Sequence, residues 1–60
     1  MRNILMIEDD SIVASIYKNK FKTEGYHVLL AADGETGLQM VASEHPALVV
    51  VDLMPLLLLL

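Results

Sequence analysis

Short apolar runs alternate with longer amphipathic segments along the chain. The two most apolar runs cover residues 4–7 and 48–51, and a third run covers residues 26–32. Between them, apolar side chains recur at helical spacing in two longer segments. Apolar runs this short, separated by helical patterns, are typical of strands buried on both faces of a parallel sheet. The sequence therefore predicts the element order β-α-β-α-β.

Polar and turn-forming residues mark the ends of the two predicted helices. Ser11 is the expected N-cap of the first helix, because its hydroxyl can accept from amides of the first turn, and Gly25 ends that helix. Asp33 is the expected cap of the second helix. Pro46 stops the second helix and should hold His45 in an extended conformation.

The expected sheet has strand order 2-1-3, with the first strand in the centre. Right-handed crossovers put the helices on opposite faces of a sheet that is wound in both directions from its first strand. The fold class is therefore α/β, half of a doubly wound parallel sheet. The predicted apolar sides are Val13, Ile16, Tyr17 and Phe21 on the first helix and Leu38, Met40, Val41 and Ala42 on the second.

Acidic residues directly follow two of the predicted strands. Glu8 and Asp9 come after the first strand, and Asp52 comes after the third. Ligands of open parallel sheets bind beyond the carboxyl ends of the strands, so these carboxylates should converge there. Carboxylates that lie so close repel one another unless protons or a cation intervene, and oxygen ligands favour Mg²⁺. The alternative is three solvated carboxylates at the starts of loops.

The same motifs resemble the first half of a bacterial response-regulator receiver domain, which has a flavodoxin-like fold. The resemblance rests on the acidic residues that end the first apolar run, on Asp33-Gly34, and on residues 46–55 around Asp52. It covers roughly residues 2–54, nearly the whole chain. The two acidic motifs occur in the right order, with two helical patterns of suitable length between them.

The resemblance implies a role for each matched residue. Asp52 matches the phosphoryl-accepting aspartate, Asp9 the direct magnesium ligand, and Glu8 a second acid that often acts through water. The backbone carbonyl of Met54 matches a further magnesium ligand. Asp10 is the acidic residue that often follows this pair, and it receives no role.

The chain departs from the family pattern after Asp52. Met54 is followed directly by Pro55, where receiver domains usually carry one more residue, and the sequence closes with five leucines, Leu56 to Leu60. We expect a truncated receiver domain over residues 1–54 and an atypical hydrophobic tail over residues 55–60. The family's hydroxyl residue on the fourth strand and lysine on the fifth have no counterpart, so we expect deficient phosphotransfer.

Composition excludes several other classes of protein. The 60 residues form one small domain, and the absence of cysteine excludes disulfides and zinc–thiolate sites. The 8 acidic and 4 basic side chains argue against a surface for nucleic acid. No apolar stretch reaches the ~20 residues of a membrane span, so a cytoplasmic protein without membrane contact is expected. His27 and His45 have no partner at metal-ligand spacing and are expected to be ordinary histidines.

Two functions of different classes compete. The first is a non-enzymatic phosphoacceptor module of a two-component system; the resemblance implies a sensor histidine kinase as partner and Mg²⁺ as cofactor. The alternative is a self-associating structural fragment without signalling activity. The third strand would be an apolar edge strand, which favours a homo-oligomer, most simply a dimer, through Leu48 to Val51 and Leu56 to Leu60.

Two further hypotheses, a phosphohydrolase and a dinucleotide-binding site, have less support in the sequence. A metal-dependent phosphohydrolase with Asp52 as nucleophile usually carries a second aspartate two residues further on, where this chain has Met54. A dinucleotide site requires a glycine-rich turn after the first strand, and the carboxylates found there would repel a pyrophosphate.

Overall fold

The computed structural model describes residues 2–52, so Met54 and the leucine tail lie outside the described residues. The elements follow in the order β1 (Asn3–Glu8), α1 (Ser11–Thr23), β2 (His27–Ala31), α2 (Gly34–Glu44) and β3 (Leu48–Asp52). This order confirms the predicted β-α-β-α-β pattern. Neither helix in this part of the chain has the length and apolarity that crossing a membrane would require.

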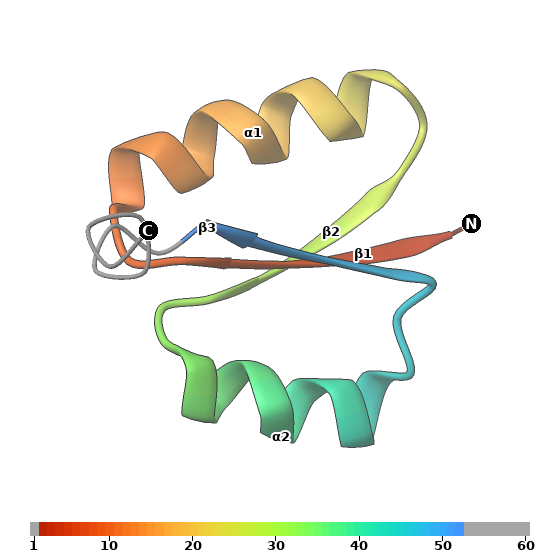
Figure 1. Ribbon diagram of the computed structural model, residues 1–60. Helices are drawn as coiled ribbons and strands as arrows, with labels where there is room; N and C mark the ends of the chain where they lie inside the picture. Colours follow the sequence, from red (N-terminus) through yellow and green to blue (C-terminus); the bar gives the residue numbers. More distant parts are fainter. Residues whose placement is uncertain (1, 53–60) are drawn as a thin grey trace.

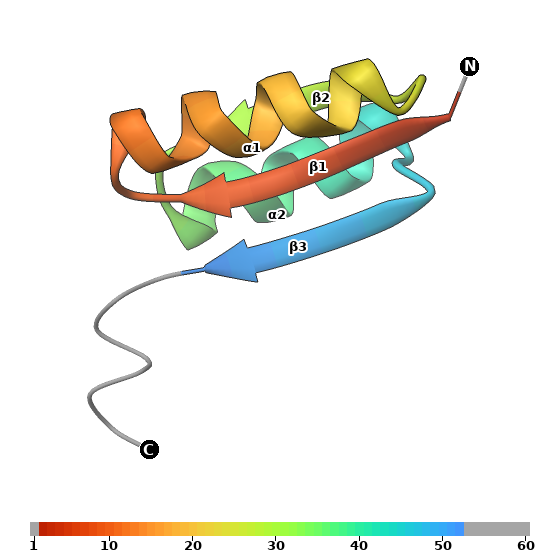
Figure 2. The same ribbon diagram turned by 90° about the horizontal axis from the view of Figure 1, so that it is seen from above.

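The strands form a parallel sheet in the order β2-β1-β3, as predicted. Central Leu5 lies opposite Leu29 of β2 and Val49 of β3. Helix α1 covers one face of the sheet and α2 the other (Figure 1), and β3 runs beside β1 in the view from above (Figure 2). The result is a three-layer α/β/α arrangement in which both connections cross over through a helix.

The core is built around β1, which is buried on both faces. Leu5 and Ile7 cluster with Ala31 of β2, and Met40 of α2 packs against this cluster. Because successive side chains of a strand point to opposite faces, Ile4 and Met6 face α1. All four of these β1 side chains are at most 5% exposed. The continuous apolar run at the start of the chain therefore reflects a strand with no solvent-facing side.

Small residues, and not only the predicted large ones, bring the helices onto the sheet. Ala14 is buried in α1 and Gly37 is buried in α2. Ile16 and Leu38, which were expected on the apolar sides, are 60% and 73% exposed. Ala14 and Gly37 are therefore the buried residues of their helices, and Gly37 lies so close to Ile7 that a Cβ atom would clash with its side chain.

Three of the predicted helix ends can be compared with the structure. Asp33 caps α2 and accepts from the backbone amide of Thr36 at 2.7 Å, as predicted. Gly25 follows the C-cap of α1 with φ 94°, a left-handed conformation that suits glycine. The extended conformation predicted for His45 is wrong: it lies in the left-handed region, with φ 48° and ψ 57°, and its amide donates to the carbonyl of Val41. The ring of Pro46 clashes with His45 only when His45 adopts the right-handed helical conformation, so the left-handed conformation stays open to it. This conformation ends α2 within one residue.

Candidate functional site

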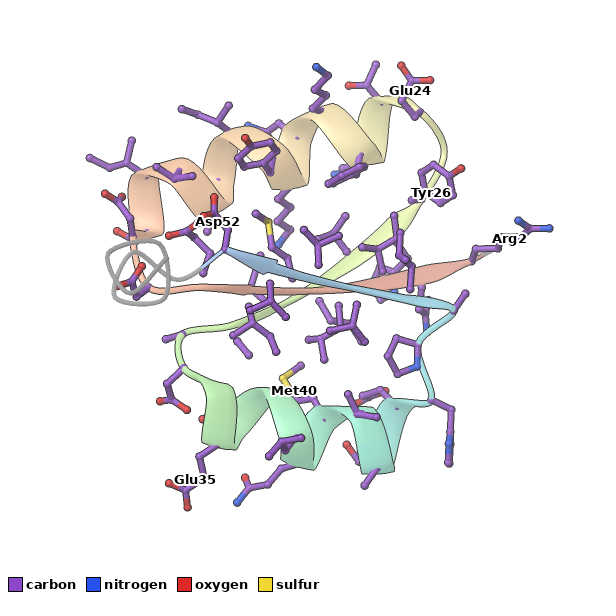
Figure 3. The ribbon with its side chains drawn as sticks, viewed as in Figure 1. Arg2, Glu24, Tyr26, Glu35, Met40 and Asp52 are labelled. Carbon is purple, nitrogen blue, oxygen red and sulfur yellow. The ribbon has the colours of Figure 1, made fainter. Side chains whose placement is uncertain are left out.

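The predicted acidic residues lie together at the carboxyl edge of the sheet. Glu8 ends β1, Asp52 ends β3, and the two are direct register partners. Asp9 begins the loop that leaves β1. Figure 3 shows Asp52 at this end of the molecule, with Arg2 at the other. The parallel pairing of β1 and β3 is therefore what brings residues far apart in the sequence to one place.

Glu8 is the buried member of this group. Its side chain is only 5% exposed, and its Oε1 accepts from the backbone amide of Asp10 at 3.0 Å. That amide by itself acts to lower the pKa of Glu8. Burial and the neighbouring carboxyls of Asp9 and Asp52 outweigh it, so the pKa of Glu8 lies above its ordinary value of 4.5. The site thus contains crowded negative charge that a proton or a cation would relieve.

Asp10, to which no role was assigned, is the N-cap of α1. Its carboxylate accepts from the amides of Ile12 at 2.9 Å and Val13 at 3.2 Å, and its backbone is extended. The prediction of Ser11 as the cap is therefore wrong, and Ser11 is the first helical residue. Aspartate caps helices as well as serine does, and its charge also suits the positive end of the helix. Asp10 thus fixes the start of α1 and, through its own amide, the carboxyl of Glu8.

A cavity of about 280 Å³ opens beside the acidic residues, on the α1 side of the sheet. Glu8 and Asp9 contribute its carboxylates, and Ser11 and Ser15 line it from the first turns of α1. Neither serine was recognised as a site residue from the sequence. Their i, i+4 spacing at the start of a helix that follows the acidic residues is the signal that could have found them.

The donor chemistry of this edge suits a hard divalent cation. Every candidate ligand is an oxygen, from Glu8, Asp9, Asp52 and the backbone carbonyl of Met54, which lies outside the described residues. Within residues 2–52, however, no three His, Cys, Asp or Glu side chains are already arranged to hold a metal ion.

The two histidines lie elsewhere. Nδ1 of His27 is 3.1 Å from Oδ1 of Asn3, at the start of the sheet, and His45 is exposed at the end of α2. Neither is near the acidic residues in sequence or along the strands.

Comparison with known proteins places the chain in a family. Residues 4–56 match the family model of the response regulator receiver domain. The chain belongs to this family. Receiver domains are signalling modules of the response regulators in two-component systems, and they typically bind Mg²⁺ at their phosphorylation site. The family implies an interaction with sensor kinases.

Several curated proteins are similar to this receiver domain. It is 45% identical over 51 residues to the probable transcriptional regulator ycf27 of Porphyridium aerugineum. This match covers 85% of the chain and 21% of that protein. It is 35% identical over 54 residues to the transcriptional regulatory protein AfsQ1 of Streptomyces coelicolor, covering 90% of the chain and 24% of that protein. It is 32% identical over 53 residues to the alkaline phosphatase synthesis transcriptional regulatory protein PhoP of Bacillus subtilis. This match covers 88% of the chain and 22% of that protein. The chain thus spans less than a quarter of the length of these relatives, and no solved structure matches it.

Proposed function

We propose that this receiver domain accepts a phosphoryl group on Asp52 from a phosphohistidine of a sensor histidine kinase. The observation that carries the proposal is the register pairing of Glu8 with Asp52 at the ends of two neighbouring parallel strands. In the transfer, a carboxylate oxygen of Asp52 forms a bond to phosphorus while the phosphorus–nitrogen bond breaks. The electron pair of the broken bond stays on the imidazole of the kinase, which then takes up a proton.

Mg²⁺ would be held by Glu8, Asp9, Asp52 and the backbone carbonyl of Met54. When bound, it neutralises the charge of the carboxylates and of the incoming phosphoryl group. The raised pKa of Glu8 supports this assignment, because burial and the carboxyls of Asp9 and Asp52 disfavour its ionised form and a bound cation would offset both. We expect weak binding of Mg²⁺.

We further propose that the 60-residue chain is phosphorylated slowly on its own. Its sequence contains no counterpart of the family's hydroxyl residue on the fourth strand or lysine on the fifth. These groups hold the phosphoryl oxygens in receiver domains. Loss of one such preorganised donor typically slows a reaction by about 10²- to 10³-fold.

Acetyl phosphate with Mg²⁺, followed by intact-mass spectrometry, tests these proposals. Slow addition of one phosphoryl group is expected, with no addition to Asp52→Asn and slower addition to Asp9→Asn. Glu24→Gln is the matched control, because it removes one acidic charge at the opposite end of the molecule (Figure 3), and it should behave as the parent does. Phosphorylation that persists in Asp52→Asn would refute the acceptor assignment. Rapid, near-complete phosphorylation of the parent would refute the proposed deficiency.

One observation favours the self-associating alternative as an additional property. Within the described residues, β3 pairs with β1 on one side only, and Leu48, Val49 and Val51 are exposed. An apolar edge strand presents unpaired backbone groups to another chain. Two copies related by a two-fold axis would pair these strands antiparallel, and Leu56 to Leu60 would add apolar surface to the contact.

Light scattering and dilution test this association. The parent should be a dimer at high micromolar concentration, and Val51→Lys should shift it toward monomer. Leu38→Lys introduces the same charge at an exposed apolar position of α2 and should leave the dimer intact. A compact parent monomer that unfolds cooperatively and independently of dilution would contradict the dimer.

A further inference from the structure

Basic side chains gather at the end of the sheet opposite to the acidic residues. A solvent-open cavity of about 410 Å³ lies here, between the C-terminal half of α1 and the start of β2. No acidic residue lines it, although the chain carries 8 acidic and only 4 basic side chains. Figure 3 shows Tyr26 and Arg2 at this end of the molecule, and Asp52 at the other. The lining residues are Lys18, Lys22, Gly25, Tyr26, His27 and Val28.

The polar side chains of this cavity come from two elements. Lys18 and Lys22 are one helical turn apart on α1, where side chains at this spacing are about 5–6 Å apart at Cβ. Both ammonium groups can therefore reach one doubly charged anion. His27 enters from β2, and its Nδ1 is 3.1 Å from Oδ1 of Asn3. In this contact Nδ1 donates to the amide oxygen of Asn3, so the positive charge at the cavity comes from the two lysines.

The last carbonyl groups of α1, which lie next to the cavity, already accept hydrogen bonds. The amide of Glu24 donates to the carbonyls of Lys20 and Phe21, and the amide of Gly25 donates to that of Lys22. These bonds satisfy three carbonyls at the end of α1, and the charges of Lys18 and Lys22 compensate the negative end of the helix dipole. Gly25 also places no side chain at the wall of the cavity.

The remaining surface of the cavity is apolar. The ring of Tyr26 lies edge-on against Phe21, with ring centroids 6.4 Å apart, and Val28 is buried. The volume lies within the range of about 300–1,000 Å³ that is usual for small-molecule sites. A ligand with an aromatic ring can therefore contact Tyr26 and Val28 while its charged group meets the lysines.

We propose that this cavity binds a small aryl phosphate. The doubly charged phosphate suits the two lysines, and the aromatic ring suits the apolar part of the lining. The site does not depend on phosphorylation, because it lies at the amino end of the strands and shares no residue with the acidic group. An Asp52→Asn variant should therefore bind the ligand as the parent does.

Titration with phenyl phosphate, followed through the backbone amide signals of His27 and Val28, tests the proposal. The double variant Lys18→Gln, Lys22→Gln should bind at least about fivefold more weakly. Lys20→Gln removes one charge from the same helix without touching the cavity lining, and it should leave affinity unchanged. Replacing Lys18 and Lys22 with arginine should retain binding, because the charge is kept.

Two further probes separate the parts of the ligand. Phenol, which lacks the charge, and inorganic phosphate, which lacks the ring, should each bind more weakly than phenyl phosphate. Equal affinity of the parent and the Lys18→Gln, Lys22→Gln variant would overturn the proposal. So would an equal loss in Lys20→Gln, which would indicate diffuse surface charge, or signal shifts centred on Asp9. Inorganic phosphate binding as tightly as phenyl phosphate would refute the aromatic part of the assignment.

Discussion

Replacing Gly37 with alanine tests how closely α2 packs on the central strand. A Cβ atom at this position would lie 2.7 Å from Cγ1 of Ile7, a distance that real Cβ atoms do not tolerate. Ile7 is only 5% exposed, so its side chain has little room to move away. Overpacking of a core typically costs about 1–3 kcal/mol. Alanine gains roughly 0.8–1.0 kcal/mol over glycine inside a helix, so we expect a net loss of up to about 2 kcal/mol.

Urea unfolding followed by far-UV circular dichroism measures this loss. Gly34→Ala is the matched control, because no heavy atom lies within 4 Å of a Cβ at that position. It should leave stability unchanged or raise it by less than about 1 kcal/mol. A Gly37→Ala variant as stable as Gly34→Ala would refute the close contact between α2 and β1.

A double-mutant cycle identifies the clashing atoms. Ile7→Val removes the Cδ1 methyl group and alone should cost about 0.5–1.5 kcal/mol. In the Gly37→Ala background the same change removes the atom nearest to the new Cβ, although Cγ1 stays, so it relieves part of the clash and its cost should fall. Effects that add within about 0.5 kcal/mol would show that the two positions do not interact.

Two further predictions concern the helix caps. Asp10→Ala should lower the free energy of unfolding in urea by about 1 kcal/mol, since it removes the cap of α1. Ser11→Ala should change this free energy by less than about 0.5 kcal/mol. Equal losses in the two variants would contradict the assignment of the cap. The backbone amide of Thr36 holds the pKa of Asp33 below its ordinary value of 3.8. The stabilisation by ionised Asp33 is therefore complete above pH 3.8 and is lost as the pH falls through the lower folded-state pKa. Unfolding measured across this range should show the parent losing stability relative to Asp33→Asn, and parallel curves would contradict the assignment.

The architecture and the meeting of the acidic residues were predictable because they depend on local patterns. The apolar runs that became β1 and β3 are continuous, which is what burial on both faces of a parallel sheet requires. Crossover handedness then leaves few topologies, and the order β2-β1-β3 follows. Parallel neighbours end at the same edge, so Glu8 and Asp52 had to converge once the order was known.

Only the tertiary structure decided which side chains are buried and what surrounds them. Glu8 and Asp9 are adjacent acids in the sequence, but packing buries Glu8 alone, and this burial raises its pKa. Helical spacing could not show that Ala14 is buried or that Gly37 closely approaches Ile7, because the periodicity of apolar residues does not measure the distance between layers. The basic cavity likewise depends on how α1 lies against β2, which brings Lys18 and His27 into the lining of one cavity. The local residue pattern determined the elements and their order. The packing of the layers determined which side chains are buried, how burial changes the pKa of Glu8, and which residues line the cavities at the two ends of the sheet.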